Sequence, residues 1–164
     1  MIFGGGVRHH KFCFLIFQAE DDKIILTWGP SGDLDLRLAI IDVCEVLPWR
    51  NCTGAFSDGD VTSGYGPETI TIENYYDKTY GVYIVCFSGN CANTRGKLDI
   101  MPKGYDTITI NVPTDYDGNY WLIGCFNGSE GLNNIKIANV LSQLSDYPSC
   151  DYNWSYCEEM CNSY

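Results

Sequence analysis

The chain has 164 residues, of which 45% are apolar and 19% are charged. This balance excludes a disordered chain and suits one domain that buries its own core. The formal net charge of −11 excludes a nucleic-acid-binding protein, because contacts to phosphates need clustered Lys and Arg and only Arg8–Lys11 form a basic group.

Residues 1–21 are predicted to form an N-terminal arm that carries one apolar strand. Within Lys11–Phe17 both faces of an extended chain are apolar, which is typical of a strand covered on two sides. The basic residues before this stretch and Gln18-Ala19 after it also resemble a signal peptide. The stretch is far too short to span a bilayer, so we interpret it as a retained strand and expect no membrane span. The residues of this predicted assembly strand are Phe12, Phe14, Leu15, Ile16 and Phe17.

A β-sandwich domain is predicted over residues 22–140. Its first strands are a short apolar one at Ile24–Trp28 and an alternating one at Asp33–Asp42. A long connection follows at residues 43–67, rich in Gly, Asp and Ser. Further strands are predicted at Glu68–Glu73, Tyr80–Phe87, Gly96–Met101, Thr107–Val112, Tyr120–Phe126 and Asn133–Ala138.

Short strands in succession, with turn residues between them and no convincing helix before residue 138, predict an all-β fold. We expect a disulfide-bonded, antiparallel β-sandwich of the immunoglobulin-like or jelly-roll-like kind. One or two amphipathic helical turns are predicted in Ile137–Leu144. Residues 141–164 form a Cys-rich C-terminal tail.

Nine cysteines in one small chain indicate an oxidising compartment, and we expect a secreted, extracellular or cell-surface protein. Zinc is the competing explanation, but the chain has no Cys-x2-Cys pair and its two histidines are adjacent. An odd number leaves one thiol free or bonded to another chain. The predicted bridges are Cys44–Cys52, Cys86–Cys125 at the ends of two similar hairpins, and one within Cys150, Cys157 and Cys161.

Carbohydrate enters the predictions in two ways, as an attached group and as a ligand. Three sequons predict N-glycosylation of a secreted chain at Asn51, Asn127 and Asn153. Tyrosines near turns are candidates for a sugar-stacking surface, namely Tyr75, Tyr76 and Tyr116. The aromatic residues within strands are expected mostly to pack the core, because half of a strand's residues face inward.

Five carboxylates, in loops or at the starts of strands, form the best candidate binding site: Asp33, Asp35, Asp58, Asp60 and Glu68. Oxygen ligands gathered at one end of a sandwich fit Ca²⁺, which takes six to eight of them. The alternative is that these carboxylates form turns and protect sheet edges. No twelve-residue EF-hand loop is present in the sequence.

Several motifs occur along the chain in a fixed order: Thr27-Trp28, Asp33-Leu34-Asp35-Leu36, Asp58-Gly59-Asp60, Gly64-Tyr65-Gly66-Pro67-Glu68 and Gly118-Asn119-Tyr120-Trp121. Together they resemble the YfaP-like domain of unknown function, over about residues 22–126. The resemblance implies a mostly bacterial, secreted or surface-exposed β-sandwich, and it carries over no catalytic residues. The chain departs from the family pattern at Arg37, where the family often has His, and in its nine Cys. The resemblance therefore extends to the domain and not to a shared ligand.

We expect no enzyme, because a nucleophilic site needs a base and both histidines, His9 and His10, lie in the arm. The leading hypothesis is an extracellular structural protein, the repeating subunit of a glycosylated filament. Lys11–Phe17 then adds as a donor strand to the next copy, which gives a head-to-tail homopolymer. The same strand pairing within its own domain stays open. The alternative function is a calcium-assisted module that binds carbohydrate or a cell-surface partner through its loop end.

Overall fold

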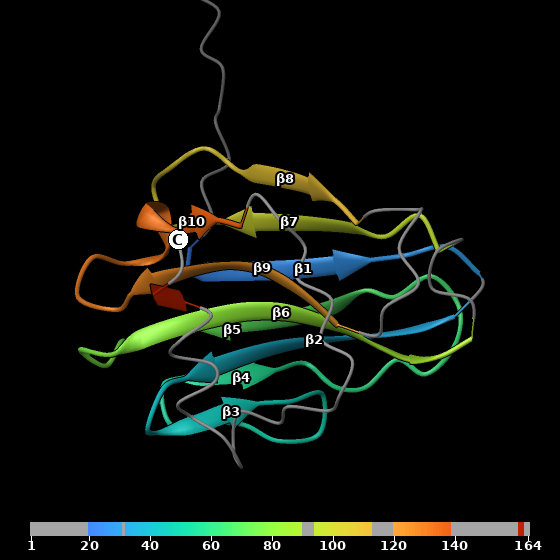
Figure 1. Ribbon diagram of the computed structural model, residues 1–164, viewed down its shortest axis with the longest axis horizontal. Helices are drawn as coiled ribbons and strands as arrows, with labels where there is room; N and C mark the ends of the chain where they lie inside the picture. Colours follow the sequence, from blue (N-terminus) through green and yellow to red (C-terminus); the bar gives the residue numbers. More distant parts are fainter. Residues whose placement is uncertain (1–19, 31, 90–93, 113–119, 139–160, 163–164) are drawn as a thin grey trace, which may run out of the picture.

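The computed structural model describes residues 20–30, 32–89, 94–112, 120–138 and 161–162, whose strands form two five-stranded sheets (Figure 1). One sheet has the order β4-β5-β1-β7-β8, formed by β1 (Asp22–Thr27), β4 (Ala55–Ser57), β5 (Glu68–Ile72), β7 (Lys97–Met101) and β8 (Ile108–Asn111). The other has the order β10-β9-β6-β2-β3, formed by β2 (Asp33–Ile40), β3 (Cys44–Val46), β6 (Thr79–Ser88), β9 (Tyr120–Asn127) and β10 (Lys136–Ile137). All of these strand pairs are antiparallel and the two sheets pack together, so the predicted β-sandwich is confirmed.

The interior between the sheets is built from alternate residues of each strand. Leu34, Leu36 and Leu38 of β2 point into it and are fully buried among apolar residues of both sheets. The intervening residues of β2 lie on the outer face of its sheet, where Ala39, together with Ile41 just after the strand, joins a second buried cluster with β6 and β9. β2 is therefore buried along its whole length, including the polar residues at its start.

Most observed strands begin and end within two residues of the predicted bounds, and three of the differences have an identifiable cause. The strand predicted at Asp33–Asp42 ends at Ile40, because Asp42 has a φ of 60° and turns the chain. The connection predicted at 43–67 contains β3 and β4, which are too short to give a period-two signal. The strand predicted at Asn133–Ala138 is a 3-10 turn at Leu132–Asn134 followed by β10.

Parts of the sequence-based predictions lie outside the described residues. The assembly strand Lys11–Phe17 is one of them, and the C-terminal tail is described only at residues 161–162. Of the predicted helical turns Ile137–Leu144, Ile137 belongs to β10, and residues from 139 onward are outside.

Two disulfides join described residues. Cys44–Cys52 is confirmed, and it ties the start of β3 to the segment before β4, in the opposite sheet. Cys125 bonds Cys161, so the predicted Cys86–Cys125 bridge is wrong, and so is any bridge within the tail that uses Cys161. The physical reason is strand direction, because β6 and β9 are antiparallel and Cys125 lies opposite Gly81, far along β6 from Cys86.

Gly81 of β6 lies beside the second bridge, at ordinary contact distance from both of its sulfur atoms. A Cβ on Gly81 of β6 would lie 3.5 Å from the Sγ of Cys161 and 4.0 Å from that of Cys125. The bridge attaches residue 161 to the outer face of the sheet, where Cys125 belongs to the second buried cluster. Cys86 instead packs against the interior between the sheets.

One end of the sandwich, which we call the acidic end, gathers the connections that matter for the site. β1 ends there and β2, β5 and β7 begin there, as the pairings Leu26 with Glu68 and Thr27 with Lys97 require. In Figure 1 it is the end at which the β1 arrow points. The loop of residues 58–67, between β4 and β5, closes this end and carries two of the five predicted acidic residues, Asp58 and Asp60.

Candidate metal centre

Three carboxylates meet at the acidic end. Asp33 and Asp35 are two residues apart on β2, so strand alternation places both on the outer face of the sheet. Asp60 comes from the loop 58–67 and is exposed. One carboxylate oxygen from each of the three lies within 4.8 Å of the other two. We call Asp33, Asp35 and Asp60 the acidic cluster.

Burial distinguishes this cluster from an ordinary group of surface acids. Asp33 is 4% exposed and Asp35 is 1% exposed. The Oδ1 atom of Asp33 is buried and has no hydrogen-bond partner among the described residues. A buried carboxylate oxygen without a donor is costly, because it has lost water and gained nothing in exchange. A cation bound by the cluster supplies the missing partner.

The electrostatics of the cluster also favour a cation. Burial raises the pKa of Asp33 above its usual range, and the neighbouring charges of Asp35 and Asp60 raise it further. Burial likewise raises the pKa of Asp35, although Arg37 opposes the shift. A divalent ion between these groups removes the like-charge repulsion that causes part of both shifts.

Arg37 holds one side of the cluster. Its Nη2 atom donates to Oδ2 of Asp35 at 2.9 Å, and both side chains are almost fully buried. The guanidinium carbon lies 5.5 Å from the ring centroid of Trp49, a cation–π contact. A buried ion pair with Arg37 thus fixes the orientation of Asp35, and the exposed Trp49 contacts the guanidinium of Arg37.

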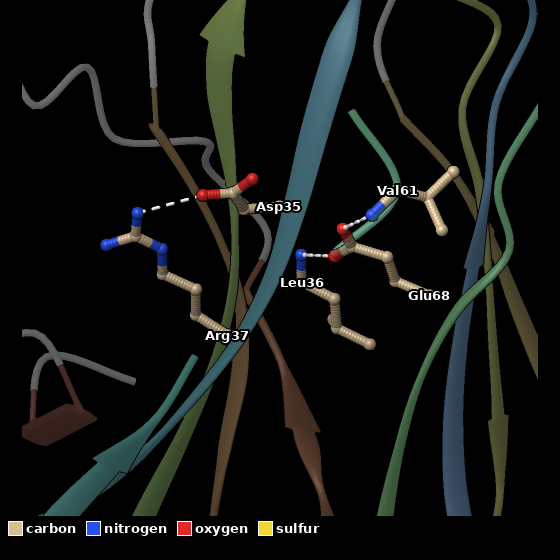
Figure 2. Close-up of polar contacts among 5 residues, drawn as sticks. All are labelled: Asp35, Leu36, Arg37, Val61 and Glu68. Atoms are coloured by element: carbon tan, nitrogen blue, oxygen red, sulfur yellow. Dashed lines mark hydrogen bonds and ion pairs between the residues drawn. The ribbon is translucent and has the colours of Figure 1, made fainter. Parts of the chain in front are cut away.

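Glu68 lies close to the cluster but uses both of its carboxylate oxygens elsewhere. Oε2 accepts a hydrogen bond from the backbone N–H of Leu36 at 2.7 Å, and Oε1 accepts one from that of Val61 at 3.2 Å. Figure 2 shows Glu68 and Val61 on one side of β2 and the Asp35–Arg37 pair on the other. Asp58 is also engaged with the backbone, since its Oδ1 accepts from the N–H of Thr69 at 2.8 Å.

Of the five predicted ligands, the structure therefore brings together Asp33, Asp35 and Asp60. The other two hold the loop that carries Asp60. A third anchor is Tyr65, whose carbonyl accepts a hydrogen bond from the N–H of Trp28. The next residue, Gly66, has a φ of +74° and lies so close to the Trp28 ring that no Cβ fits.

Arg37 was noted in the sequence only as a departure from a family pattern. A charged residue inside a buried alternating strand nevertheless indicates that the strand provides it with a partner.

The residues predicted to carry or bind carbohydrate differ in how exposed they are. Asn51 and Asn127 are exposed, and Asn153 lies outside the described residues, as does Tyr116. Tyr75 and Tyr76, two of the candidates for a sugar-stacking surface, are half-buried and pack against the core. Among the described residues, the exposed aromatic ones are Trp49, Phe56, Tyr65, Phe87 and Tyr105.

Comparison with known proteins leaves the chain without a match. No protein family matches it, and no curated protein or solved structure does so either. The resemblance to the YfaP-like domain stays a prediction. Within the part of the chain that the structure describes, no helix is long and apolar enough to cross a membrane.

Proposed function

We propose that this protein is an extracellular, disulfide-bonded β-sandwich module that binds Ca²⁺ through Asp33, Asp35 and Asp60. The observation that carries the proposal is the unpartnered, buried Oδ1 of Asp33 within a cluster of three carboxylates. Oxygen-only ligands favour Ca²⁺ over zinc or copper, which prefer imidazole and thiolate. The exposed side of Asp60 leaves room for the water or ligand oxygens that complete the coordination of Ca²⁺.

Thermal unfolding with and without Ca²⁺ tests this proposal. An ion that binds only the folded protein stabilises it by about 2.7 kcal/mol at one hundred times its dissociation constant, so the midpoint must rise. We expect Asp33→Asn and Asp60→Asn to lose the rise, and Asp106→Asn, at an exposed turn between β7 and β8, to keep it. An unchanged midpoint at millimolar Ca²⁺ in the unaltered protein contradicts the proposal.

Two exposed aromatic residues support carbohydrate as the ligand of this module. Trp49 is 57% exposed and lies over Arg37, which binds Asp35. Phe87 is 59% exposed and sits where the pairing of β6 shifts opposite Asp33 and Leu34. Sugar hydroxyls suit the open positions of a bound Ca²⁺, and aromatic faces suit the apolar faces of a sugar ring. We propose a binding module and no catalytic role.

A glycan-binding screen with and without Ca²⁺ tests the carbohydrate ligand. We expect binding that chelation of Ca²⁺ abolishes and that Trp49→Ala weakens roughly tenfold, the loss of one stacking contact of about 1.4 kcal/mol. Tyr105→Ala is the matched control, because Tyr105 is equally exposed but lies in the turn between β7 and β8. Binding that survives chelation contradicts a role for the ion in recognition.

A further inference from the structure

Glu68 is the first residue of β5, yet its side chain forms hydrogen bonds with β2 of the other sheet and with the loop 58–67. It is 1% exposed, and its two oxygens accept from the backbone N–H groups of Leu36 and Val61. On β2, the partner strand β3 covers only Leu38–Ile40, so the N–H of Leu36 lies beyond the last pair of that ladder. The carboxylate of Glu68 accepts the hydrogen bond from Leu36 that a longer β3 would otherwise accept.

The two donors are the immediate neighbours of two cluster residues. Leu36 follows Asp35 on β2, and Val61 follows Asp60 in the loop. A single carboxylate therefore holds the backbone beside Asp35 and the backbone beside Asp60 at once (Figure 2). When Glu68 is ionised, both hydrogen bonds have a charged acceptor, and such bonds are shorter and stronger than neutral ones.

We propose that Glu68 is a positioning residue of the calcium site, which sets the separation of Asp60 from Asp33 and Asp35 without binding the ion. This inference rests on the proposed function. The loop 58–67 has further anchors at Asp58 and Tyr65, but neither of them reaches β2. Glu68 is the described contact that ties the Asp60 segment to the strand carrying the other two ligands.

The first test is calorimetric titration of Ca²⁺ into the Glu68→Gln variant. Glutamine has the same shape but one acceptor oxygen, so one of the two backbone N–H groups faces an NH₂ donor. We expect the dissociation constant for Ca²⁺ to weaken by 10- to 100-fold, the usual effect of losing an outer partner of a metal ligand. Glu73→Gln, an exposed position just after β5, is expected to leave it unchanged.

Amide hydrogen exchange of the unaltered protein gives a readout that does not depend on a variant folding. If Glu68 couples the loop to the site, Ca²⁺ slows exchange at both Leu36 and Val61. Binding of Ca²⁺ with unchanged exchange at these amides, or equal affinity in Glu68→Gln, overturns the positioning role and leaves the calcium site standing. Failure of the unaltered protein to bind Ca²⁺ overturns the proposed function, and the role of Glu68 with it.

Discussion

Glu68 is a buried side chain whose raised pKa affects how the stability of the folded protein depends on pH, which can be measured without any ligand. Burial raises its pKa to about 8, the hydrogen bonds from Leu36 and Val61 oppose the shift, and the charges of Asp35 and Asp60 add to it. In the unfolded chain a glutamate titrates near 4.5. Between these two values the folded protein binds a proton that the unfolded chain has already released.

The raised pKa of Glu68 makes its contribution to the stability of the folded protein depend on pH. Because the folded state binds more protons than the unfolded state between pH 4.5 and about 8, the contribution of Glu68 to stability falls as pH rises through that range. The slope is at most about 1.4 kcal/mol per pH unit for one group. The raised pKa values of Asp33 and Asp35 act in the same direction.

Urea unfolding in a Ca²⁺ chelator, from pH 5 to pH 8, measures this slope. We expect the free energy of unfolding to decline with pH in the unaltered protein and to decline less steeply in Glu68→Gln. Saturating Ca²⁺ should flatten or reverse the decline, because the ion favours ionised carboxylates around it. A free energy that rises steadily with pH in the chelator would show that Glu68 is ionised in the folded protein.

The sequence predicted all three residues of the acidic cluster, but it also counted Asp58 and Glu68 among the ligands. Alternation along β2 places Asp33 and Asp35 on one face, and this much can be deduced from a period of two. The roles of Asp58 and Glu68 cannot be deduced in this way. They depend on which backbone N–H groups are left without a strand partner, and for Leu36 that is decided by the short length of β3.

At the scale of elements, the long strands and the short-range Cys44–Cys52 bridge were predictable, and the pairing of Cys125 with Cys161 was not. β2 and β6 carry enough alternating residues to be recognised, whereas β3 and β4 exist only through their pairing with β2 and β5. The repeated Cys-Phe motifs at Cys86 and Cys125 look equivalent in sequence. In the sheet their strands run in opposite directions, and their side chains belong to different clusters.

The two described disulfides should differ in what they contribute to stability. Cys44 and Cys52 are separated by 8 residues, whereas Cys125 and Cys161 are separated by 36. In the chain-entropy description a bridge stabilises more when it closes a longer loop, and these separations differ by about 1.3 kcal/mol in that respect. We therefore expect the double substitution Cys125→Ala/Cys161→Ala to lower the free energy of unfolding more than Cys44→Ala/Cys52→Ala does.

Urea unfolding of the two double variants and the unaltered protein measures the difference. Each bridge is expected to contribute on the order of 2–4 kcal/mol. Alanine is the replacement of choice at Cys125 because that position is buried and a hydroxyl would need a partner. A larger loss from the Cys44–Cys52 pair would mean that the link between the sheets matters more than loop length.

At the scale of the whole molecule, the sheet edges bear on the hypothesis, made from the sequence, that copies of the protein assemble. β8 is an edge strand that pairs only with β7 among the described strands, and its Ile108 and Ile110 are half-buried against the core. An edge of this kind is a template for an added strand. The apolar segment Lys11–Phe17 has the composition of such a strand, with apolar residues on both faces.

Deleting residues 1–19 tests assembly by strand donation. If the segment is donated to a neighbouring copy, the shortened chain should fold with the same thermal midpoint at low concentration and sediment as a monomer. The full chain should form larger species as its concentration rises, because a head-to-tail contact does not close on itself. An insoluble or unfolded shortened chain indicates instead that the strand completes its own domain, since an unmet edge and an exposed core then favour aggregation. Ca²⁺ should be present in the measurements on the shortened chain and on the full chain, because we expect it to stabilise the acidic end whether or not the copies assemble.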